Sequence, residues 1–129
     1  MTESGKDGLF ITFRPGTTAE ELKNRFPPPV YFTAVIDGAA AQGKAALMEA
    51  LAAAFRFPPY FGKNWDALAD CLRSLPDSLP AKSYVLVVNN SEMFLARSEA
   101  DRKDFAETAL AAGEFLQEKF KIQFRVALL

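Results

Sequence analysis

The sequence predicts an α/β fold built on a small parallel sheet, and three observations support this. The continuous apolar run SYVLVV, residues 83–88, is typical of a central strand covered on both faces. Strand-like and helix-like segments alternate along residues 30–129. A chain of 129 residues with 50% hydrophobic residues can bury one real core. We therefore expect a two-layer sandwich, a three-stranded parallel sheet with helices packed on one face, plus an N-terminal extension.

The predicted extension covers residues 1–29. Residues 9–13, LFITF, alternate weakly like a short strand, and Pro15-Gly16 marks a turn. Thr17 and Thr18 each have a glutamate three residues later, a capping-box pattern that predicts a short helix. Three prolines at 27–29 end that helix and separate the extension from the main domain, residues 30–129.

Three strands and three helices are predicted in the main domain. The strands cover residues 30–36, 83–88 and 122–128, and the helices cover 44–55, 64–72 and 99–120, the second capped by Asn64 and the third by Ser98 or Asp101. Right-handed crossovers between strands in sequential order place every helix on the same face of the sheet. Residues 122–128 alternate apolar and polar side chains, so we expect this last strand at an edge with one wetter face.

Composition excludes several classes of function. The absence of histidine and the single cysteine rule out His-dependent triads, disulfides and the usual zinc sites, so we expect no enzyme, no metal and no cofactor. A net charge of −1 argues against direct nucleic-acid binding. No signal-peptide pattern and no membrane-length apolar run are visible, and together with the single cysteine this predicts a cytoplasmic location.

Residues 38–45, GAAAQGKA, match the first part of a phosphate-binding loop. That motif needs a hydroxyl after the lysine to hold magnesium, and here the position is Ala45. The central strand ends in Asn89-Asn90 and offers no aspartate for the metal. We interpret the segment as an alanine-rich helix start.

The stretch PPYFGKNWDALADCL, residues 58–72, places two carboxylates one helical turn apart. At about 100° per residue, Asp66 and Asp70 fall together on the polar flank of a helix, with Arg73 beside them. The helix dipole accounts for Asp66 in the first turn but not for Asp70. An acid–base pair would need a cleft, a metal site would need more oxygen ligands, and an acidic ridge would need a basic partner surface.

The run YFGKNWDALADCL resembles the central motif of the barstar family of intracellular ribonuclease inhibitors. The resemblance extends over residues 30–129 and implies a barstar-like sandwich. It also implies that the chain inhibits a barnase-type ribonuclease or related nuclease toxin, as an antitoxin or immunity protein. The acidic helix would cover the basic active site and mimic RNA phosphates. A barstar-fold regulatory interaction module without inhibitor activity is the alternative, and a carboxylate-based enzyme is a weaker third.

The resemblance also implies which residues bind the partner. Asp70 would be the principal anchor, Asp66 its companion and Tyr60 an aromatic on the active-site rim. Ala69 stands where the familiar inhibitor has an aromatic residue, so Trp65 serves either the interface or the core. Glu118 is the expected contact from the last helix, with Glu114 as the alternative. The predicted partner-binding set is Tyr60, Gly62, Asn64, Trp65, Asp66, Ala69, Asp70 and Glu118. Cys71 is expected to be a buried core residue.

Overall fold

The structure, a computed structural model, describes residues 2–4, as backbone, and residues 8–129. Its strands are β1 (Thr2–Ser4), β2 (Phe10–Thr12), β3 (Tyr31–Asp37), β4 (Ser83–Asn89) and β5 (Gln123–Leu128). Its helices are α1 (Ala19–Arg25), α2 (Lys44–Ala54), α3 (Trp65–Arg73), α4 (Leu75–Ser78) and α5 (Glu99–Phe120), with short 3-10 turns η1 (Gly38–Ala40) and η2 (Ser91–Met93).

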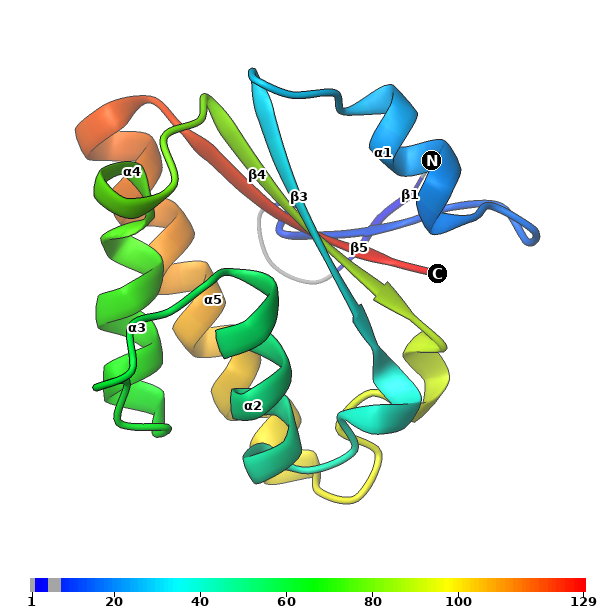
Figure 1. The fold of residues 1–129 in the computed structure, drawn as a ribbon. Helices are drawn as coiled ribbons and strands as arrows, with labels where there is room; N and C mark the ends of the chain where they lie inside the picture. The colour runs from blue at the N-terminus through cyan, green and yellow to red at the C-terminus, as the bar shows by residue number, and fades with distance from the viewer. Residues whose placement is uncertain (1, 5–7) are drawn as a thin grey trace.

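The described strands form one sheet in the order β1-β2-β5-β4-β3 (Figure 1). Strands β2, β5, β4 and β3 run parallel, and β1 pairs antiparallel with β2. In β4, Ser83 lies opposite Tyr31 of β3 on one side and Gln123 of β5 on the other. The predicted α/β class with a parallel sheet is confirmed, and so is the central position of residues 83–88.

Side chains on the two faces of the sheet form two separate cores. Helices α2, α3 and α5 lie on one side of the sheet, and α1 lies on the other (Figure 1). On β4, Leu86 joins the large cluster under α2, α3 and α5, whereas Val87 joins a small cluster under α1. We call these the helix-side cluster and the α1-side cluster; the buried members of the latter are Leu22, Val85, Val87 and Ala127. Because both faces are covered, β4 is apolar at nearly every position.

Two details of the predicted sheet were wrong. The last strand, β5, is not at an edge, because β2 pairs with its outer side and brings Phe10 opposite Val126. The parallel sheet therefore has four strands rather than three. The long helices α2, α3 and α5 do lie on one face as predicted, and α1, from the predicted extension, packs on the other. The polar alternation of β5 arises because Gln123 and Arg125 lie on the α1 face, where a seven-residue helix covers only part of the sheet.

The predicted helix starts agree with the observed N-caps. Thr18 Oγ1 accepts the Glu21 N–H at 3.2 Å at the start of α1. Ser98, rather than Asp101, is the N-cap of α5, and its Oγ accepts the Asp101 N–H at 3.1 Å. These hydrogen bonds satisfy backbone donors that a helix start leaves unpaired. The division of the chain at residue 29 remains a prediction.

Candidate functional site

The loop before α3 turns one aromatic residue inward and its neighbour outward. Phe61 is buried, its ring centroid lies 5.0 Å from that of Phe57, and its N–H donates to the Pro58 carbonyl at 3.0 Å. Tyr60, one residue earlier, is 86% exposed. Phe61 therefore fixes the loop on the core while Tyr60 is presented to solvent.

Asn64 connects this loop to α3. Its Oδ1 accepts the Ala67 N–H at 2.8 Å, and its Nδ2 donates to the Gly62 carbonyl at 3.4 Å. Its backbone is extended, at φ −136° and ψ 174°, as an N-cap requires. Both polar atoms of the Asn64 side chain are thus engaged within the protein, and they set the direction in which α3 leaves the loop.

Helix α3 buries one flank and exposes carboxylates on the other. Leu68 and Leu72 are buried in the helix-side cluster. Asp66 and Asp70 are exposed, and the Asp70 side chain retains 73% of its accessible surface. The two carboxylates are one turn apart on the same flank, as the helical spacing predicts. We call the exposed surface formed by Asp66, Asp70 and Arg73 the α3 ridge.

Trp65 and Ala69 lie between the buried and exposed flanks. Both are half-buried. Trp65 packs against the helix-side cluster, and the Lys44 ammonium lies 5.8 Å from its ring centroid. Trp65 therefore packs on the core and also keeps part of its surface accessible, so it can serve both the core and an interface.

Positive charges dilute the acidic flank. Arg73 Nη2 lies 2.5 Å from Asp70 Oδ1, and the Arg73 guanidinium lies 5.9 Å from the ring centroid of Phe115 in α5. Lys63 in the loop is paired with Glu49 of α2 at 2.5 Å. Within the described chain, Asp66 takes part in no ion pair. The site is therefore a surface of mixed charge with one open carboxylate.

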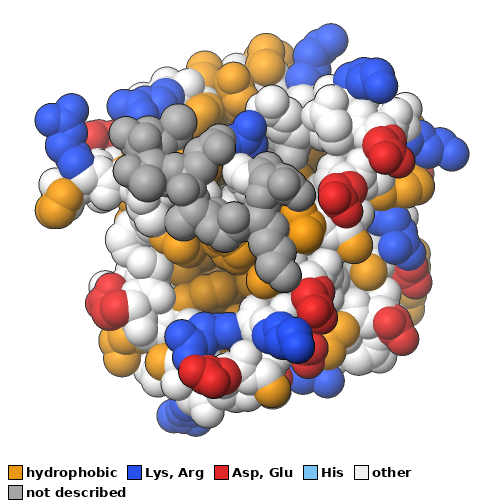
Figure 2. Space-filling view, turned by 180° about the vertical axis from the view of Figure 1, so that it is seen from behind, with side chains coloured by type: hydrophobic (Ala, Val, Ile, Leu, Met, Phe, Trp, Pro, Cys, Tyr) orange, Lys and Arg blue, Asp and Glu red, His pale blue; other side chains and the backbone are white. Residues whose placement is uncertain are grey.

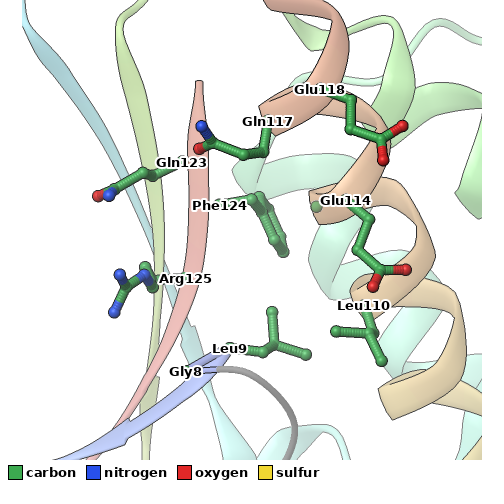
Figure 3. A pocket seen from close by; sticks show the side chains of 10 residues that line it. Gly8, Leu9, Leu110, Glu114, Gln117, Glu118, Gln123, Phe124 and Arg125 are labelled. Atoms are coloured by element: carbon green, nitrogen blue, oxygen red, sulfur yellow. The ribbon is translucent and has the colours of Figure 1, made fainter. Parts of the chain in front are cut away.

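The two candidate glutamates of α5 lie along one side of that helix. Glu114 and Glu118 both line a pocket of about 310 Å³ between α5 and the start of β5. Figure 3 shows their carboxylates directed away from Phe124 and Leu9, toward the outer side of α5. At about 100° per residue, Glu118 lies about 60° from Phe115 and Glu114 about 100° from it. Because Phe115 contacts Arg73, Glu118 is the glutamate nearer to the side that faces α3.

The described residues contain neither a metal-binding cluster nor a membrane-spanning helix. Residues 2–4 and 8–129 contain no cluster of His, Cys, Asp and Glu side chains that could hold a metal ion. No helix in this part of the chain is long and apolar enough to cross a membrane. Cys71 is half-buried against the helix-side cluster, and burial, followed by the charge of Asp70, raises the pKa of its thiol. A raised pKa keeps the thiol protonated and weakly nucleophilic.

A family model described as Barstar (barnase inhibitor) matches residues 31–128, from the start of β3 to the end of β5. The chain belongs to the barstar family. No individually curated protein matched the chain. The barstar match includes the loop before α3, α3 itself and α5, and it begins after β1, β2 and α1. The description of the family model names inhibitors of barnase.

The contact between Arg73 and Phe115 could not be found from the barstar-like motif. The helical wheel placed Arg73 beside the two aspartates, but it carried no information on which residue of α5 would meet it. α3 and α5 pack closely although they are far apart in the sequence. The sequence signal for this contact was the presence of an aromatic residue, Phe115, on the last predicted helix.

Proposed function

We propose that this barstar-family protein inhibits a barnase-type ribonuclease or a related nuclease toxin inside the cell. The inhibitor would lay α3 and the loop before it over the nuclease active site. The observation that carries this proposal is the pair of exposed carboxylates one turn apart on α3, beside a loop that exposes Tyr60. These features lie within the residues that the barstar family model matches.

The proposed interface works by mimicry of phosphate. A ribonuclease binds RNA phosphates with arginine and lysine side chains, and a carboxylate can accept charge-assisted hydrogen bonds from those groups. Asp70 would be the principal anchor and Asp66 its companion. Tyr60 would pack on the active-site rim, because exposed aromatic residues are enriched among interface anchors.

The remaining proposed contacts have supporting roles. Asn64 caps α3 and fixes its direction, so its contribution to binding would be partly indirect. Gly62, Ala69 and the accessible edge of Trp65 would supply close packing around the carboxylates. Glu118 of α5 would add a further acidic contact to those of Asp70 and Asp66, with Glu114 as the alternative.

Long-range attraction to a basic partner should be weak for this chain. The net charge is −1, and basic and acidic side chains are intermingled on the face seen in Figure 2. Association would therefore depend on the local field of the α3 ridge. Such a field is screened by salt over about 10 Å at 0.1 M, so inhibition should weaken as ionic strength rises.

Inhibition of a purified barnase-type ribonuclease tests the proposal. The proteins to compare are the wild type, Asp70→Ala, Asp66→Ala and the control Glu20→Ala, whose side chain is exposed on α1 at the other face of the sheet. We expect salt-sensitive inhibition that both ridge variants weaken and the control preserves. Folded wild-type protein that fails to inhibit this ribonuclease and other nuclease toxins would contradict the proposal and point to an interaction module without inhibitor activity.

A further inference from the structure

Arg73 already pairs with one oxygen of Asp70, the carboxylate that the proposed inhibitor would use as its principal anchor. We propose that Arg73 is a specificity-determining residue that masks Asp70 and leaves Asp66 as the open anion of the α3 ridge. On this proposal, the α3 ridge binds a partner that presents only cationic groups less tightly than a partner that also presents an acceptor for Arg73. The inference rests on the proposed function for its biological meaning, but the masking itself is a property of the free protein.

Two contacts hold the Arg73 side chain in the masking position. Its Nη2 lies 2.5 Å from Asp70 Oδ1, three residues earlier on the same helix. Its guanidinium also lies 5.9 Å from the ring centroid of Phe115, where a cation is attracted to the aromatic face. The Lys119 ammonium lies 5.9 Å from the centroid of the same ring, so two cationic groups lie next to Phe115 beside the α3 ridge. The Arg73 side chain is only 39% exposed, which fits a side chain held against α5.

Asp66 differs from Asp70 in each of these respects. It lies in the first turn of α3, is exposed, and has no ion-pair partner among the described residues. The nearest basic residue in the loop, Lys63, is held by Glu49 at 2.5 Å. A cation that approaches the ridge therefore finds Asp66 without an ion-pair partner, whereas Asp70, although 73% exposed, is already paired with Arg73 through Oδ1.

The free-energy cost of separating Arg73 from Asp70 depends on which groups the partner places at the α3 ridge. A partner cation placed at Asp70 also meets the Arg73 guanidinium, and like charges brought together at an interface oppose binding. A partner that also places a hydrogen-bond acceptor beside the Arg73 guanidinium avoids this repulsion. Because exposed ion pairs are individually weak, we expect masking to change affinity by about fivefold rather than by orders of magnitude.

A hexa-arginine peptide tests masking without any nuclease. The carboxyl NMR signals of Asp66 and Asp70 are followed while the peptide is added at low salt to the wild type, Arg73→Gln and the control Arg102→Gln. Arg102 is a matched control because it forms an exposed i,i+3 pair with Glu99 in α5. We expect the peptide to move the Asp66 signal in all three proteins. The peptide concentration that produces half of the Asp70 shift should be about five times lower in Arg73→Gln than in wild type. An equal response of Asp70 in wild type and Arg73→Gln would overturn the proposal.

Inhibition of a barnase-type ribonuclease provides the second arm. Arg73→Gln should inhibit about fivefold more tightly than wild type at low salt, and the gain should disappear near 1 M salt. Arg73→Lys keeps the positive charge but lacks the planar, forked set of guanidinium donors, so its affinity for the ribonuclease should lie between those of wild type and Arg73→Gln. It also keeps the test possible if Arg73→Gln folds poorly. Weaker inhibition by folded Arg73→Gln would overturn masking. Absence of inhibition by every variant, together with the expected peptide result, would remove the nuclease proposal and retain the masking.

Discussion

Tyr60 is the residue whose exposure is hardest to explain by folding alone. At 86% it is the most exposed large hydrophobic side chain among the described residues, while its neighbour Phe61 is buried. We predict that Tyr60→Ala weakens inhibition of a barnase-type ribonuclease by at least about thirtyfold, the loss of a hot-spot anchor worth about 2 kcal/mol. Met93→Ala, which truncates another exposed side chain on η2, should leave inhibition unchanged. Equal inhibition by wild type and Tyr60→Ala would remove Tyr60 from the interface.

Gly38 is required by close packing at the end of β3. A Cβ atom at this position would lie 2.4 Å from the Asn90 carbonyl oxygen and 2.8 Å from that of Asn89, and both are backbone atoms that cannot swing aside. We predict that Gly38→Ala lowers the free energy of unfolding by about 1–3 kcal/mol, measured by urea denaturation. Gly113→Ala in α5 is the control: its Cβ would make an ordinary 3.8 Å contact with Phe124, and helix propensity should raise stability by up to about 1 kcal/mol. An unchanged Gly38→Ala protein would mean that Gly38 and the backbone at the end of β4 approach less closely than described.

Leu22 shows, at the scale of elements, how α1 joins the fold. Its side chain is 0% exposed and packs with Val85, Val87 and Ala127 on the face of the sheet opposite α3. We predict that Leu22→Ala lowers the free energy of unfolding by about 2–4 kcal/mol, because truncation leaves a cavity under α1. Lys23→Ala, on the exposed side of the same helix, should have little effect. If Leu22→Ala were as stable as wild type, α1 would not be docked on the sheet in solution.

The elements also show how far the sequence could predict this molecule. Helix starts, the central strand and the shared flank of Asp66 and Asp70 depend on local spacing and capping, and the sequence carries that information directly. The pairing of β2 with β5 and the contact of Arg73 with Phe115 join segments far apart in the chain. Side-chain periodicity reveals which way a residue faces but not which segment lies beside it. For that reason β5 was wrongly expected at an edge, and the contact of Arg73 with Phe115 was not predicted.

The pH dependence of stability is a property of the whole molecule, and Tyr84 contributes to its alkaline side. Tyr84 is 0% exposed, and its hydroxyl donates to the Leu79 carbonyl at 2.6 Å. Burial raises the pKa of Tyr84 above its ordinary value of 10.0. The unfolded chain therefore loses this proton first, so the folded state holds more protons above about pH 10 and stability falls as pH rises.

We predict that Tyr84→Phe flattens the loss of stability between about pH 9 and pH 11, although it lowers stability near neutral pH by about 1 kcal/mol through the lost hydrogen bond.

Asp37→Asn is the reciprocal control. The Asn90 amide and then the Ala39 N–H lower the pKa of Asp37, so its stabilisation is present above the ordinary value of 3.8 and is lost as pH falls. Urea denaturation across the pH range should show that Tyr84→Phe changes the slope of stability against pH only on the alkaline limb, and Asp37→Asn only on the acid limb. An unchanged alkaline slope in Tyr84→Phe would assign that limb to other groups, of which the half-buried Cys71 thiol, with its raised pKa, is the first to test.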